Sequence, residues 1–170
     1  MNKLLLNGQL LREGENTFIL YRTQSKEFKL PIEADNDELF KSNKWVSFSG
    51  ELRTQTYYEG ERRRKRTFGH GTLCDAVMAD YVNEFQCMGT VVKIFELRTT
   101  PLSKRKVIDF TVAVDNNYYN CIAFGEQAEN VRHYKREGDE INVLIALFQS
   151  REYEKNGKQV AYEVCVRKFV

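Results

Sequence analysis

The chain has 170 residues, of which 42% are hydrophobic and 29% charged, and this composition excludes a disordered protein. Its net charge is only +2, and each side of Val82 carries 13 Lys and Arg against 12 Asp and Glu, so an electropositive surface requires local clustering. The apolar runs are too short for a membrane span or a signal peptide. The four cysteines lack C-x-x-C spacing and lie within or beside apolar stretches, so we expect a cytoplasmic protein with reduced, mostly buried thiols.

Strand signals dominate the chain. They are segments rich in β-branched and aromatic residues, many of them alternating apolar with polar positions, at 3–11, 17–23, 27–34, 45–58, 85–97, 107–115, 118–124, 141–153 and 160–170. One helix is predicted over 125–139, because Ala128, Val131 and Tyr134 form an apolar stripe and Gly138 supplies a stop. A shorter helical segment is expected at 36–43.

The chain also contains an internal repeat. "MNKLLLNGQL" at 1–10 matches "VNEFQCMGTV" at 82–91, which pairs Gly8 with Gly89. "GELRTQTYYEGE" at 50–61 matches "ALFQSREYEKNG" at 146–157, which pairs Tyr57 with Tyr153. The offsets are 81 and 96 residues, so the second copy is longer by 15 between its first and fourth strands.

The repeat predicts an all-β protein of two tandem domains, 1–80 and 83–170. Each copy has about five strands with a short helix between the third and the fourth. This count is too small for a sandwich of two full sheets and favours a closed Greek-key barrel, the oligonucleotide-binding (OB) fold. Its binding surface would lie on one face and on the loops at the rim.

Catalysis and cofactors are not expected. His70 and His133 are the only histidines in the sequence, and neither belongs to a nucleophile, metal or phosphate-loop motif. We interpret His70 as a turn residue and His133 as a residue of the helix surface.

Residues 83–170 resemble the bacterial single-stranded DNA-binding protein (SSB) family. The resemblance rests on "MGTVVKIFELRTTP", "IDFTVAVD", "YYNCIAFGEQAENVRHYKREGDEINV" and "LFQSREYEKNGKQVAYEV". The first half resembles the family at "NGQLLRE" and "GELRTQTYYEG". "NVLIALFQSREY" has one residue more than the family pattern, which predicts a β-bulge near Ala146. The chain ends on a strand without the family's acidic tip, as in PriB-type primosomal proteins.

The resemblance implies stacking positions for bases at Tyr118, Phe124 and Tyr153, and the repeat adds Tyr57 and Tyr58. Phe68 and Phe28 are further candidates on neighbouring strands. Basic residues that fall on OB loops are expected to bind phosphates, and they are Arg62, Arg63, Arg64, Lys65, Arg66, Lys104, Arg105, Lys106, Arg151, Lys155 and Lys158.

We therefore expect sequence-independent binding of single-stranded DNA in replication, recombination or repair, by a homodimer that presents four OB barrels. The host would be a bacterium, a phage or a mobile element. A PriB-like adaptor that contacts replication or primosome proteins is the alternative, and RNA binding stays open. The run "YYEGERRRKRTF" at 57–68 is read as a hairpin of the first barrel in preference to a nuclear address.

Overall fold

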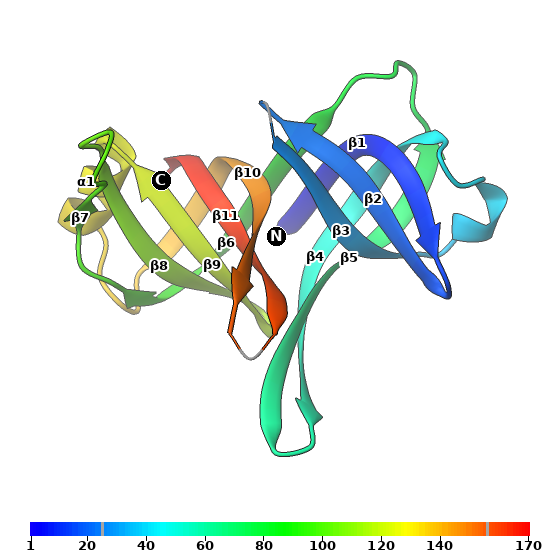
Figure 1. Cartoon of the computed structure of the whole chain (residues 1–170). Helices are drawn as coiled ribbons and strands as arrows, with labels where there is room; N and C mark the ends of the chain where they lie inside the picture. The colour runs from blue at the N-terminus through cyan, green and yellow to red at the C-terminus, as the bar shows by residue number, and fades with distance from the viewer. Residues whose placement is uncertain (25, 156) are drawn as a thin grey trace. The chain divides into compact units, whose positions relative to one another are not determined.

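The computed structural model describes residues 1–24, 26–155 and 157–170, and the chain divides into two compact units (Figure 1). The N-terminal unit comprises 2–84, and the C-terminal unit comprises 85–170 together with Met1.

The N-terminal unit is a closed barrel of five strands. They are β1 (Asn2–Glu13), β2 (Asn16–Thr23), β3 (Lys26–Ala34), β4 (Trp45–Glu59) and β5 (Arg62–Asp75). The neighbours follow the order β1-β2-β3-β5-β4 and back to β1, with β3 and β5 parallel and the other pairs antiparallel. Leu4, Leu6 and Leu10 alternate along β1 and are fully buried, so one face of the strand fills the barrel.

The C-terminal unit repeats this topology. Its elements are β6 (Val82–Ile94), β7 (Arg98–Thr99), β8 (Lys106–Val114), β9 (Asn117–Phe124), α1 (Glu126–Tyr134), β10 (Glu140–Glu154) and β11 (Lys158–Phe169). The barrel order β6-β8-β9-β11-β10 and back to β6 is equivalent to that of the first unit, again with one parallel pair, β9 and β11. Helix α1 lies between the third and fourth barrel strands and buries Ala128 and Val131 against β8 and β9.

Two glycines at matching positions of the repeat allow the barrels to close. A Cβ atom on Gly8 would stand 1.9 Å from the carbonyl oxygen of Leu20 in β2. A Cβ atom on Gly89 would stand 2.3 Å from the carbonyl oxygen of Ala113 in β8. The first strand of each barrel thus crosses the second too closely for any side chain at this point.

The helix predictions need correction at their ends. Helix α1 stops at Tyr134 and does not reach 139, because the backbone N–H of Arg136 donates to the Asp139 carboxylate at 2.7 Å and forms a turn. At 36–43 the structure has a single 3-10 turn, Asp37–Leu39, and Asn36 bonds the backbone of Leu73 with its side chain. The predicted bulge is confirmed by register shifts between Val143 and Ala146 in β10.

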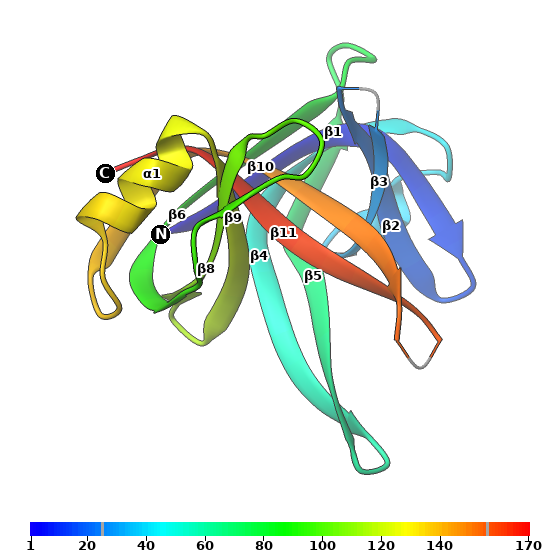
Figure 2. The ribbon, with the colours of Figure 1, turned by 60° about the vertical axis from the view of Figure 1, so that its left-hand side comes forward.

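The fourth and fifth strands of each barrel run on into a hairpin. We call the first hairpin the segments 53–59 of β4 and 62–67 of β5, and the second hairpin the segments 149–154 of β10 and 158–162 of β11. Figure 2 shows each of them projecting beyond the barrel of its own unit, the first as a long two-stranded arm. Both hairpins carry residues that the sequence assigned to binding.

Candidate nucleic-acid interface

The first hairpin places a tyrosine directly opposite an arginine on one of its faces. Tyr57 pairs with Arg64 across the two strands, and residues that pair directly share a face with Cβ atoms about 4.5–5.5 Å apart. Tyr57 keeps 47% of its surface exposed. Arg62 and Arg66 lie two residues on either side of Arg64 and therefore point to the same face.

The opposite face of the first hairpin has the same pairing. Tyr58 lies opposite Arg63, and Thr56 lies opposite Lys65. Tyr58 is 71% exposed, and both Arg63 and Lys65 are exposed. The run of five basic residues is thus divided between two faces of one ribbon.

Acidic neighbours already hold two of these arginines. The Nε of Arg64 lies 3.2 Å from a carboxylate oxygen of Glu59, and the Nη1 of Arg66 lies 2.9 Å from Glu33 on β3. Among the described residues, no ion pair involves Arg62 or Arg63. Arg62 and Arg63 are therefore better placed than Arg64 and Arg66 to bind a phosphate.

The stacking role predicted for Phe68 and Phe28 is not supported, because both side chains are buried. Phe68 is 7% exposed, and the guanidinium of Arg66 covers its ring at 4.5 Å from the centroid. Phe28 is 6% exposed and packs against Tyr21 with ring centroids 5.6 Å apart. Neither ring offers a face to a base in this structure.

The second hairpin is less basic than the first. Tyr153 is 41% exposed and lies opposite Gln159, and the Tyr153 hydroxyl donates to the Gln159 side chain at 3.1 Å. Arg151 lies 3.2 Å from Glu163, whose other carboxylate oxygen accepts from Gln149 at 3.2 Å. Lys155 and Lys158 are exposed beside the turn. Because Glu163 holds Arg151, the two lysines are better placed for phosphates.

A cleft of about 580 Å³ lies on the outer face of the C-terminal barrel. Four of its lining side chains come from neighbouring strands, Thr111 on β8, Asn120 on β9, and Arg151 and Glu163 on the second hairpin and β11. Phe95 and Arg98 close one side, and Arg98 is fixed by Asp109 at 2.7 Å. Asn120, Thr111 and Phe95 were not among the predicted binding residues. Asn120 and Thr111 each lie between two buried residues of their strand, so alternation alone places both side chains on the outer face.

Tyr118 and Phe124 occupy the same outer face of β9 as Asn120. Tyr118 stands two residues before Asn120 and is 52% exposed. Phe124 is half-buried against Val107, Ile122 and Cys165. The guanidinium of Arg105 lies over its ring at 5.0 Å, so a base could reach this ring only by displacing Arg105.

The basic turn at Lys104–Lys106 is fixed by local bonds. The N–H of Thr100 donates to the carbonyl of Arg105 at 2.8 Å, and the N–H of Arg105 donates to the Thr100 hydroxyl at 3.0 Å. Lys106 forms an ion pair with Glu129 of helix α1. Lys104 is exposed and has φ of 53°, which places it at the turn itself. Lys104 is thus the member of the group most open to a phosphate.

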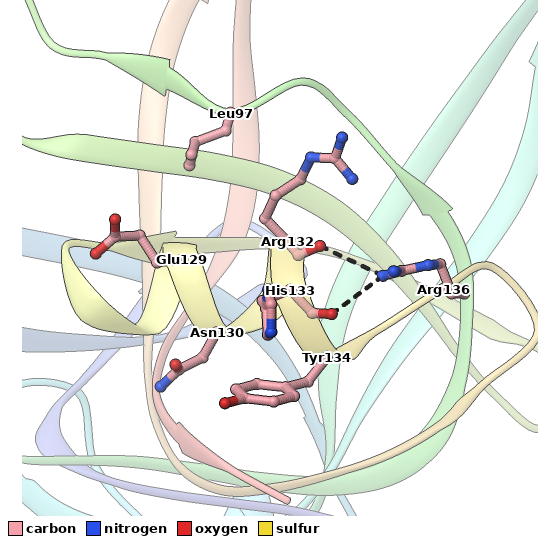
Figure 3. A pocket seen from close by; sticks show the side chains of 7 residues that line it. All are labelled: Leu97, Glu129, Asn130, Arg132, His133, Tyr134 and Arg136. Atoms are coloured by element: carbon pink, nitrogen blue, oxygen red, sulfur yellow. Dashed lines mark hydrogen bonds between the residues drawn. The ribbon is translucent and has the colours of Figure 1, made fainter.

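A second cleft of about 580 Å³ lies beside helix α1 (Figure 3). Arg132, His133 and Tyr134 line it together with Leu97. The Nη1 of Arg136 donates to the carbonyl of Lys135 at 2.8 Å and to the carbonyl of His133 at 3.3 Å. Arg136 therefore caps the C-terminal end of the helix and has a structural role.

The remaining chemistry of the structure is limited. Burial raises the pKa of the Cys87 thiol to about 12, which suits a core residue and not a reactive one. Within residues 1–24, 26–155 and 157–170, no cluster of His, Cys, Asp and Glu is arranged to hold a metal ion. No helix of the described chain is long and apolar enough to span a bilayer.

Comparison with known proteins gives a family and a fold. A profile described as "Single-strand binding protein family" matches residues 82–170, and no curated protein matches the sequence. The crystal structure of the wild-type single-stranded DNA binding protein from Thermus aquaticus is similar over 100% of this chain and 92% of its own, with 16% identity and a TM-score of 0.74. A deletion mutant of that protein covers 100% and 93%, with 15% identity and a TM-score of 0.73.

These matches confirm two predictions made from the sequence. The family resemblance drawn from motifs at 83–170 is confirmed, since the profile spans the same segment. The tandem OB fold is confirmed, since the Thermus aquaticus structures match both units of the chain. At 15–16% identity, the structural likeness establishes the fold and assigns no role to single residues.

Proposed function

Because this chain belongs to the single-strand binding protein family, whose members bind DNA and are not enzymes, we propose that it binds single-stranded DNA without sequence preference. Bases would stack on exposed tyrosines, and phosphates would lie against the basic residues beside them. Every base has an aromatic face, so stacking tolerates any sequence.

The observation that carries this proposal is the pairing of tyrosine with arginine on the first hairpin. Tyr58, which is 71% exposed, faces Arg63, and Tyr57, which is 47% exposed, faces Arg64 with Arg62 two residues along the same face. A nucleotide needs these two groups side by side, because its base and its phosphate are joined through one sugar. Each stacked base contributes about 1–3 kcal/mol to binding, and each phosphate contact adds salt dependence.

The C-terminal unit would bind single-stranded DNA with groups of the same kinds. Tyr118 and Tyr153 provide further ring faces, and the cleft on the outer face of the barrel is lined by Asn120, which can donate or accept a hydrogen bond. Lys104, Lys155 and Lys158 supply the charges. Arg105 over Phe124 can contribute either as a cation or, once displaced, by exposing the ring.

In the cell, the protein would coat single strands and prevent re-annealing during replication, recombination or repair. We further propose a homodimer with four barrels, a state that the family resemblance suggests. Sedimentation equilibrium tests this part separately, and a monomer at all concentrations would contradict it.

Fluorescence titration tests the central proposal. Oligo-dT should bind far more tightly than a duplex of the same length and should quench tyrosine fluorescence. Its affinity should fall steeply when the salt concentration is raised. Equal binding of duplex would contradict base stacking. Weak binding of oligo-dT would favour a PriB-like adaptor of primosome proteins, and tighter binding of oligo-rU would favour an RNA target.

A further inference from the structure

The first hairpin is a ribbon with two open faces. From Arg53 onward its side chains alternate between the faces, and the residues that pair across the strands share a face. Tyr57 and Tyr58 are neighbours in sequence, point to opposite faces and are 47% and 71% exposed. Each face of the ribbon tip therefore presents an accessible tyrosine.

Each face holds the complete pair of groups that a nucleotide requires. One face has Tyr57 beside Arg64, with Arg62 two residues along the strand. The other face has Tyr58 beside Arg63, with Lys65 two residues along. Cross-strand neighbours lie within about 5.5 Å at Cβ, and diagonal neighbours lie about 7–8 Å apart. A base stacked on Tyr58 can therefore place its phosphate against Arg63, and a base stacked on Tyr57 can place its phosphate against Arg62, since Glu59 holds Arg64.

The second hairpin shows that the barrel does not demand two such faces. In the repeat, Tyr153 matches Tyr57, whereas Glu154 takes the place of Tyr58. Glu154 pairs with Lys158, and Glu152 pairs with Val160. The second hairpin thus has an aromatic ring on one face and a carboxylate at the matching position of the other. The second tyrosine–arginine face belongs to the first hairpin only.

We propose that the first hairpin holds two separate segments of single-stranded DNA, one on each face, and so bridges two strands. This inference rests on the proposed function. Two DNA segments repel each other, so a bridge needs positive charge. The five consecutive basic residues from Arg62 to Arg66 outnumber the two acidic residues at the turn, Glu59 and Glu61, and supply this charge.

A two-step capture experiment tests the bridge. Full-length protein is first saturated on a long immobilised oligo-dT, and a short fluorescent oligo-dT is then added. The complex should capture the short strand. Tyr58→Ala and Tyr57→Ala should each weaken this second capture about 5- to 150-fold, the effect of one lost stack. Glu154→Ala, at the position of Tyr58 in the second hairpin, should not weaken capture, because it removes no ring and no positive charge.

The outcomes separate the bridge from the general function. If the protein binds the immobilised strand but captures no second strand, the bridge is refuted while the proposed function stands. Capture that survives in Tyr58→Ala also refutes it, because the second strand must then lie elsewhere. If the protein fails to bind the immobilised strand at all, the proposed function itself fails.

Discussion

Gly89 gives the sharpest test of the barrel geometry. Its α-carbon lies so close to β8 that a Cβ atom would stand 2.3 Å from the carbonyl oxygen of Ala113, whereas real Cβ atoms stay beyond 3.0 Å. The obstacle is a backbone atom of a strand that is paired on both sides, so it cannot rotate away. Gly89→Ala should therefore force β6 and β8 apart.

The expected cost follows from this overlap. Overpacking typically costs about 1–3 kcal/mol, and we expect the upper end, about 3 kcal/mol, because a backbone atom cannot move aside as a side chain can. Alanine restricts the unfolded chain and returns about 0.4–1 kcal/mol. The net loss is about 2 kcal/mol of a domain stability of about 5–15 kcal/mol, which lowers the Tm by roughly 8–16 °C.

Urea unfolding followed by circular dichroism measures the loss. Gly8→Ala should destabilise the N-terminal unit by at least as much, since its Cβ would approach Leu20 to 1.9 Å. Met88→Ala is the control, because Met88 is adjacent to Gly89 and half-exposed. If Gly89→Ala and Met88→Ala unfold at the same urea concentration, the strands do not cross as closely as described.

Three further predictions concern binding and pH. Tyr153→Ala should weaken oligo-dT binding about 5- to 150-fold while Tyr153→Phe, which keeps the ring, stays within a few-fold of wild type; equal losses would assign the effect to the hydroxyl bond to Gln159. Changing Arg62, Arg63 and Lys65 to Gln should lower the slope of log K against log salt by roughly 2, against roughly 1.4 for Lys155 and Lys158; slopes that do not change would place the phosphates elsewhere. Burial raises the pKa of Tyr162 from 10.0 to about 12, so the phenol ionises first in the unfolded chain, and the stability present below pH 10 should fall as the pH rises towards 12. Urea unfolding at a series of pH values measures this fall, and Tyr162→Phe should reduce it. An unchanged pH dependence in Tyr162→Phe would contradict the assignment.

The strands and their pairing could be predicted because period-two alternation and the repeat agree. Leu4, Leu6 and Leu10 match Phe85, Cys87 and Val91, and all six are fully buried. The shared glycine was visible in the sequence as a match between Gly8 and Gly89. Its reason, a close crossing of two strands, needs coordinates, since sequence spacing does not report distances between strands.

Depth on the outer face could not be predicted, because alternation assigns a side chain to a face and not to an exposure. Phe68 lies on the outer face of β5, and yet it is buried under Arg66. Likewise, the four cysteines were expected to be mostly buried, and Cys74 is exposed while Cys87, Cys121 and Cys165 are buried. Charge partners such as Glu59 for Arg64 depend on rotamers that the sequence does not specify.

The matched positions of the repeat explain why the two hairpins should contribute unequally. Leu52 and Phe148 are equivalent and both 1% exposed, so the barrel fixes the chain up to this point in each unit. Beyond it the sequences diverge, because no core packing constrains a projecting ribbon. The first hairpin fills these positions with five basic residues on both faces, whereas the second retains Glu152 and Glu154. Carboxylates repel phosphates, so the first hairpin should supply most of the electrostatic affinity, and the second should act mainly through Tyr153 and the cleft beside it.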